Sequence, residues 1–170
     1  QCINYTKADG TGVVSSGGIT LGTSQSTASG TAIDFTGIPA GTKIITMSLT
    51  GVSIDGAEGI FVQLGDAGGI ETTGYLSAAF NDVGHNNSVS GFLLNNSTDA
   101  GSLWHGTYIL TLVDSAAFSW VGSWSMASTT TVDGSAGGGS KSLSAELTQV
   151  RLTSETPSNF DAGKVNITYQ

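Results

Sequence analysis

The sequence predicts an all-β domain, an antiparallel β-sandwich of jelly-roll-like type with a short N-terminal arm. Three observations lead to this fold class. Segments with two-residue apolar alternation recur along the chain, clusters of Gly, Asn, Asp and Ser separate them, and no segment shows the sustained apolar period of a helix. The 170 residues suit one domain, since single domains typically hold about 100–200 residues.

The clearest strand is Lys43–Ser53, where Ile45, Met47 and Leu49 alternate with hydroxyl residues. Further strands are expected over Gly59–Leu64, Ser88–Leu94, Leu103–Val113, Ala117–Met126, Ser142–Arg151 and Lys164–Tyr169. Loops are expected where turn-forming residues cluster, over Asp66–Gly69, Asn81–Asn87, Asn95–Gly101 and Asp133–Ser140.

Residues 1–30 are expected to form an arm, and residues 31–170 the sandwich. Gly, Ser and Thr dominate the arm, so it contains little apolar surface to offset the entropic cost of becoming ordered without neighbours. Ile19 and Leu21 alternate in it, which permits a short edge strand. The lone Cys2 also lies there, and one thiol excludes an internal disulfide. We interpret it as an incidental free thiol, with pairing between chains as the alternative.

The charge balance excludes two classes of function. Only 5 Lys and Arg residues stand against 13 Asp and Glu residues, and the net charge of −8 repels a phosphate backbone, so no nucleic-acid partner is expected. No apolar run reaches the roughly 20 residues that a helix needs to cross a bilayer, so no membrane insertion is expected.

A nucleophilic enzyme finds weak support in the sequence. Asp82 and Ser88 lie near His85, as a triad would require, but serine is so common here that such proximity is expected by chance. No nucleophile elbow lies between a strand and a helix. A glycosidase would need paired carboxylates, for which Glu58 and Glu71 are the candidates, although their spacing does not establish that they meet.

A calcium site is a second minor alternative. Asp66, Asp82 and Asp99 fall in expected loops and could offer oxygen ligands, but no EF-hand or calcium repeat is present. The sequence therefore predicts a protein that is not an enzyme and has no catalytic residues, cofactor or metal.

Aromatic and imidazole side chains near polar loops are the remaining candidates for contact with a ligand. Aromatic faces stack on sugar rings, and polar ring atoms add hydrogen bonds. The candidate glycan or host-contact residues are Tyr75, Phe80, His85, Trp104 and His105. Trp120 and Trp124 are four residues apart, so a strand places them on one face, and we interpret them as core anchors rather than ligand contacts.

Three phrases of the sequence together resemble a known domain. They are FTGIP at Phe35–Pro39, QLGDAGGIETTGY at Gln63–Tyr75 and FDAGKVNI at Phe160–Ile167. Residues 30–170 resemble the β-rich C-terminal domain of virion proteins of tailed bacteriophages, found in tail-fibre-like and unassigned structural proteins. The resemblance implies a structural and host-contact role, with no catalytic motif to transfer.

The sequence thus leads to a hypothesis of a bacteriophage virion structural protein on the particle surface, a tail-fibre or adhesin-type host-contact domain. Its expected partners are further copies of itself, with a trimer favoured, other virion proteins, and host surface glycans. A capsid head-decoration (cement) protein is a close alternative. A non-viral carbohydrate-binding module or extracellular filament subunit, whose arm would donate a strand to a neighbour, is the alternative from another class.

Overall fold

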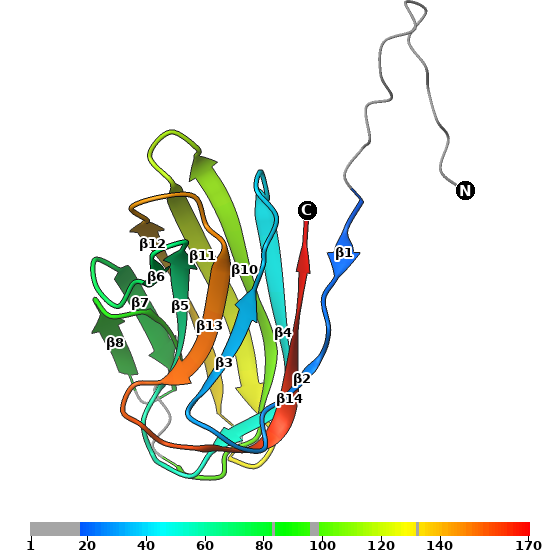
Figure 1. Ribbon diagram of the computed structural model, residues 1–170. Coiled ribbons are helices and arrows are strands. Elements are labelled where there is room, and N and C mark those ends of the chain that lie inside the picture. The colour runs from blue at the N-terminus through cyan, green and yellow to red at the C-terminus, as the bar shows by residue number, and fades with distance from the viewer. Residues whose placement is uncertain (1–17, 83, 96–98, 132) are drawn as a thin grey trace, which may run out of the picture.

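The computed structural model describes residues 18–82, 84–95, 99–131 and 133–170, and every regular element within these ranges is a β-strand. The strands form two antiparallel sheets that pack face to face, which confirms the predicted sandwich (Figure 1). The large sheet contains β1 (Thr20–Leu21), β2 (Gln25–Ser26), β4 (Ile44–Ile54), β7 (Leu76–Asn81), β8 (Gly84–Ser88), β10 (Trp104–Asp114), β11 (Ser119–Ser128), β12 (Gly134–Ser142) and β14 (Phe160–Tyr169). The small sheet contains β3 (Ala32–Thr36), β5 (Ile60–Asp66), β6 (Gly69–Ile70), β9 (Phe92–Asn95) and β13 (Gln149–Ser154).

Long central strands of the large sheet follow the predicted alternation. In β4 the side chains of Ile45, Met47 and Leu49 are buried and the intervening hydroxyl residues face outward. The large sheet runs in the order β1-β14-β4-β10-β11-β12-β7-β8, with β2 also paired to β14. The small sheet runs β3-β13-β5-β6, with β9 paired to β5. One face of each sheet therefore lines the core and leaves the outer face to solvent.

A row of aromatic rings crosses the core. Tyr75 meets Phe92 edge-on at a centroid distance of 5.2 Å, Phe92 lies 5.5 Å from Tyr108, and Tyr108 lies 6.1 Å from Trp124. Trp120 is 3% exposed and Trp124 is 5% exposed, so the prediction that they are core anchors is confirmed. Such rings supply much of the apolar area that a sandwich core buries.

The prediction of a loop at Asp133–Ser140 followed by a strand at Ser142–Arg151 is wrong. The glycine-rich stretch forms β12, and the later stretch contains a connection that leads into β13. The aromatic core explains the glycines, because a Cβ on Gly137 would lie 2.3 Å from Trp124 Cζ2 and 2.3 Å from the Ala78 carbonyl oxygen. Gly137 therefore leaves space for the indole of Trp124. The glycine-rich sequence has the pattern of a loop but forms a strand of the sandwich.

The described part of the predicted arm lies along the edge of the large sheet. Thr20 pairs with Tyr169, and Gln25 pairs with Val165, so β1 and β2 cover the free edge of β14. Thr27 is fully buried, and its hydroxyl donates a hydrogen bond to the Ala162 carbonyl at 2.7 Å. Residues 1–17, and with them Cys2, lie outside the described residues.

Candidate functional site

The five predicted contact residues differ sharply in exposure. Tyr75 is 0% exposed and Trp104 is 1% exposed, so the structure places both predicted contact residues in the core and not at the surface. Both are large rings that the sandwich uses to fill its core, and the polar sequence around them gave no sign of this. Phe80 is 61% exposed, His85 is exposed and His105 is half-buried.

Phe80 and His85 form a cross-strand pair on the surface. The stretch Asn81–Asn87, expected to be a loop, instead provides the end of β7 and most of β8, and Phe80 lies opposite His85 in that antiparallel pair. Directly opposed side chains share one face of a sheet, with Cβ atoms roughly 5 Å apart. The pair therefore presents an apolar ring and an imidazole side by side.

Further apolar side chains surround this pair. Leu76 is 73% exposed at the start of β7, and Val89 is 65% exposed just beyond β8. We call the exposed side chains of Leu76, Ala78, Phe80, His85 and Asn87 the hairpin site. Ala78 and Asn87 are also direct partners across the two strands, so the site is one continuous strip.

Two solvent-open hollows flank the hairpin site. Each has a volume of about 360 Å³. The first is lined by Tyr75, Leu76, Ser77, Ala78, Asn87, Ser88, Val89 and Gly138. The second is lined by Phe80, Asn81, Asp82, Ser125, Gly134, Ser135 and Ala136. Shallow hollows beside an aromatic face, with amide and hydroxyl groups around them, suit the edge of a sugar ring or a chain lying on the surface.

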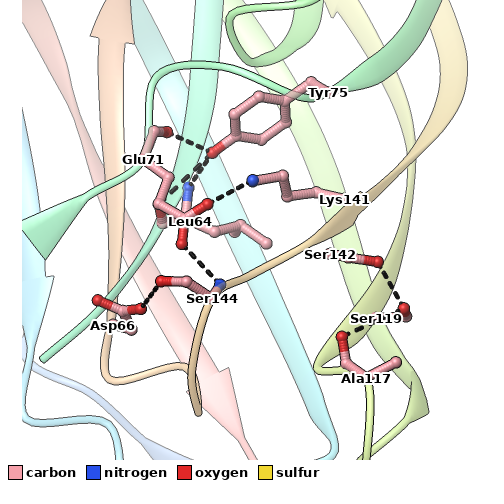
Figure 2. Close-up of polar contacts among 9 residues, drawn as sticks. All are labelled: Leu64, Asp66, Glu71, Tyr75, Ala117, Ser119, Lys141, Ser142 and Ser144. Carbon is pink, nitrogen blue, oxygen red and sulfur yellow. Dashed lines mark hydrogen bonds and ion pairs between the residues drawn. The ribbon is translucent and has the colours of Figure 1, made fainter. Parts of the chain in front are cut away.

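A polar cluster lies behind the hairpin site and holds the segment that leads into β7 (Figure 2). The Leu64 N–H donates to the Tyr75 hydroxyl at 2.7 Å, and that hydroxyl donates to the Glu71 carbonyl oxygen at 2.8 Å. The Lys141 ammonium makes an ion pair with the Glu71 carboxylate and lies 5.4 Å from the centre of the Tyr75 ring. These contacts join β5, β12 and the segment that enters β7.

Hydrogen bonds keep the acids of this cluster ionised. Burial opposes ionisation of Glu71, but the hydrogen bonds from Lys141 and from the Ser144 N–H outweigh it and lower the pKa of that carboxyl. The Ser144 hydroxyl donates to Asp66 at 2.6 Å and, with the Gly68 N–H, lowers the pKa of Asp66. In Figure 2, Ser119 and Ser142 add a hydroxyl pair at 2.6 Å between β11 and β12. The acids here are partners in structural contacts.

His105 lies apart from the hairpin site. The Gly51 N–H donates to His105 Nδ1 at 3.3 Å, and His105 Nε2 lies 3.4 Å from the Thr129 hydroxyl. Because Nδ1 accepts a hydrogen bond, the neutral ring carries its proton on Nε2. Four strand spacings of about 4.8 Å separate β10 from β8, so His105 and His85 belong to different places on the sheet.

The carboxylates considered for a glycosidase and for a calcium site are held by different partners. Glu58 accepts hydrogen bonds from Thr156 and Ser158, which lower its pKa, whereas Glu71 is held by Lys141. Among the residues that the structure describes, no group of three or more His, Cys, Asp or Glu side chains is arranged to hold a metal ion. The three aspartates of the calcium alternative are accordingly not gathered into such a group.

Comparison with known proteins returned no similarity: no protein-family model, curated protein sequence or solved structure matches this chain. Within the described ranges, no helix is long and apolar enough to span a membrane.

Leu76 and Lys141 are the main participants that sequence reasoning missed. Leu76 and Phe80 are four positions apart, an even spacing, so their shared face could be predicted once β7 was identified as a strand. Lys141 gave no comparable signal, because an isolated lysine next to a glycine run is typical of a solvated loop. Its burial depends on Glu71, which lies far away in the sequence.

Proposed function

We propose that this chain is a structural protein of a bacteriophage virion, displayed on the particle surface as a tail-fibre or adhesin-type host-contact domain. The virion assignment rests on the three family-like phrases of the sequence. The host-contact assignment rests on one observation, the exposed Phe80–His85 pair beside two open hollows. The proposed ligand is a host surface glycan.

The proposed contact is shallow, and its strength comes from repetition. An open surface strip with one aromatic ring offers little area to a single sugar, so single-site affinity is low. A homo-oligomer, with a trimer favoured, would present several strips at once and raise the overall affinity without further contacts at each site. Other virion proteins would anchor the oligomer to the particle.

Glycan-array binding by the oligomeric protein tests the host-contact proposal. Phe80→Ala removes the exposed ring, and we expect it to abolish binding. Val113→Ala is a matched control, because Val113 is an equally exposed apolar residue (65%) at the end of β10. Equal thermal unfolding midpoints would show that both variants fold. Binding that survives Phe80→Ala, or that is lost equally in both variants, would contradict the proposed site.

A head-decoration protein is the second candidate, and the broad outer face of the large sheet favours it. A flat surface of hydroxyl-bearing strands suits packing in a regular shell. If purified capsids bind the protein at saturating, stoichiometric amounts while whole host cells do not, decoration replaces host contact as the role.

A further inference from the structure

The centre of the large sheet has an outer face without charged side chains. Strands β14, β4, β10, β11 and β12 lie side by side there (Figure 1). Among the described residues, no Asp, Glu, Lys or Arg points outward from β4, β10, β11 or β12 away from the strand ends. On β14 the exposed charged residue away from the strand ends is Lys164, which pairs with Thr50 beside this region. We call this surface the neutral face and define it by Thr46, Thr107, Ile109, Val121, Ser123 and Ser125.

The neutral face combines apolar and hydroxyl groups. Ile109 and Val121 are each 43% exposed near its centre, and Ile109 is flanked by Thr46 and Ser123 in the strand register. The charged residues nearest to it are Asp114, at the end of β10, and Lys164, in the middle of β14 at the level of Thr50. Depletion of charge with apolar residues at the centre and polar residues around them is the composition of a protein–protein interface core.

The outer face of the small sheet is different. Arg151 and Asp34 form an exposed two-pronged ion pair there, at 2.7 and 2.8 Å. Charge is therefore accepted on the outer face of the small sheet and missing from the centre of the outer face of the large sheet. Solubility alone would favour charges on both faces, so their absence from the centre of the large sheet calls for a contact.

The net charge points to what covers the neutral face. Each copy of the chain has a net charge of −8, so two copies repel wherever their acidic surfaces approach. A surface free of charge lets two such copies meet with the least repulsion and without burying an unpaired ion. A strongly basic partner would instead select an acidic surface, and the neutral face does not offer one.

The area is sufficient for a stable contact between copies. Five strands spaced about 4.8 Å apart, each contributing about seven residues with a rise of about 3.4 Å, cover roughly 600 Å². Two copies would thus bury about 1,200 Å² in total, which passes the roughly 1,000 Å² expected of a specific interface.

From these observations we propose that the neutral face is the surface through which copies of this chain associate. The inference rests on the self-assembly in the proposed function and names the surface that carries it. The hairpin site adjoins the neutral face, because Ser125 also lines the hollow beside Phe80. His85 and Asn87 lie on β8, two strands beyond β12, and are the part of the hairpin site farthest from the contact.

Sedimentation equilibrium of the full chain over a range of concentrations tests this surface. Ser123→Glu places a carboxylate in the middle of the neutral face, and we expect association to weaken by on the order of a hundredfold, because the interface would then bury repelling charges. Thr36→Glu is the matched control, since it adds the same charge at an exposed strand position of the small sheet. It should leave association within about threefold of the wild type.

Ser123→Lys separates a local from a global charge effect. This variant lowers the net negative charge of each copy, yet it should also weaken association, because it too places charge in the contact. Association that is unchanged by both Ser123 variants, or strengthened by Ser123→Lys, would overturn the assignment of the neutral face as the association surface. The proposed self-assembly would then stand without it. A wild-type chain that stays monomeric at every concentration would overturn both.

Discussion

Removing the carboxylate of Glu71 should destabilise the protein by about 3 kcal/mol, because breaking a buried ion pair typically costs about 3–5 kcal/mol. The side chain of Lys141 is 5% exposed and that of Glu71 is 22% exposed, so water can compensate little for the ion pair that Glu71→Gln removes. In this variant the Lys141 ammonium would still lie 5.4 Å from the centre of the Tyr75 ring, but it would have lost its counter-ion. We take the lower end of the range because Glu71 keeps some contact with solvent.

The same geometry predicts how a second substitution restores stability. Lys141→Met removes the buried charge and keeps the length of the side chain, so Glu71→Gln combined with Lys141→Met should unfold within about 1 kcal/mol of the wild type. The exposed pair Asp34–Arg151 is the control, with side-chain exposures of 37% and 34%. Asp34→Asn should cost at most about 1 kcal/mol, as surface ion pairs do.

Urea unfolding with a common slope for all variants measures these differences. The single substitution should also lower Tm by roughly 6–12 °C, given about 2–4 °C per kcal/mol for a chain of this length. If Glu71→Gln costs no more than Asp34→Asn, the polar cluster is not a buried anchor of the hairpin site. A double variant less stable than Glu71→Gln alone would refute the role of the unpaired ammonium.

Three further outcomes follow from the packing and the charges. Gly137→Ala should cost about 2–3 kcal/mol in urea unfolding, because its Cβ meets Trp124 at 2.3 Å, whereas Gly138→Ala, with 3.6 Å to its nearest neighbour, should cost under about 1 kcal/mol. Truncating the core ring in Trp104→Ala should cost about 3–5 kcal/mol by the same assay, far more than Phe80→Ala at the surface. The lowered pKa of Glu71 stabilises the fold above its unfolded value of about 4.3, so stability should fall as the pH drops from about 5 to 3, and thermal melts of Glu71→Gln should show a shallower decline.

Strand alternation carried most of what the sequence could tell about the fold. The residues Ile45, Met47 and Leu49 show their inward face directly, and the four-residue spacing of Trp120 and Trp124 places both rings in the core. These features are local, since each strand displays its own buried face whatever it pairs with. They sufficed for the sandwich class.

Features that depend on distant partners were out of reach. Gly137 lies in a core strand because Trp124 occupies the space of a side chain, and nothing near Gly137 in the sequence reveals that ring. The burial of Trp104 was missed for the same reason, since its polar neighbours suggest a surface. Phe80 and His85 were individually predicted to be contact residues, but their pairing needed the register of β7 against β8.

Location on the particle tests the central claim most directly. Purified virions that encode this chain can be labelled with a gold-conjugated antibody raised against the folded domain and viewed by electron microscopy. The proposed role predicts label on the outside of intact particles, concentrated at the tail tip for a host-contact domain or spread over the head for a decoration protein. Intact particles without surface label, with the chain found only in the unassembled fraction of the lysate, would contradict a virion surface protein.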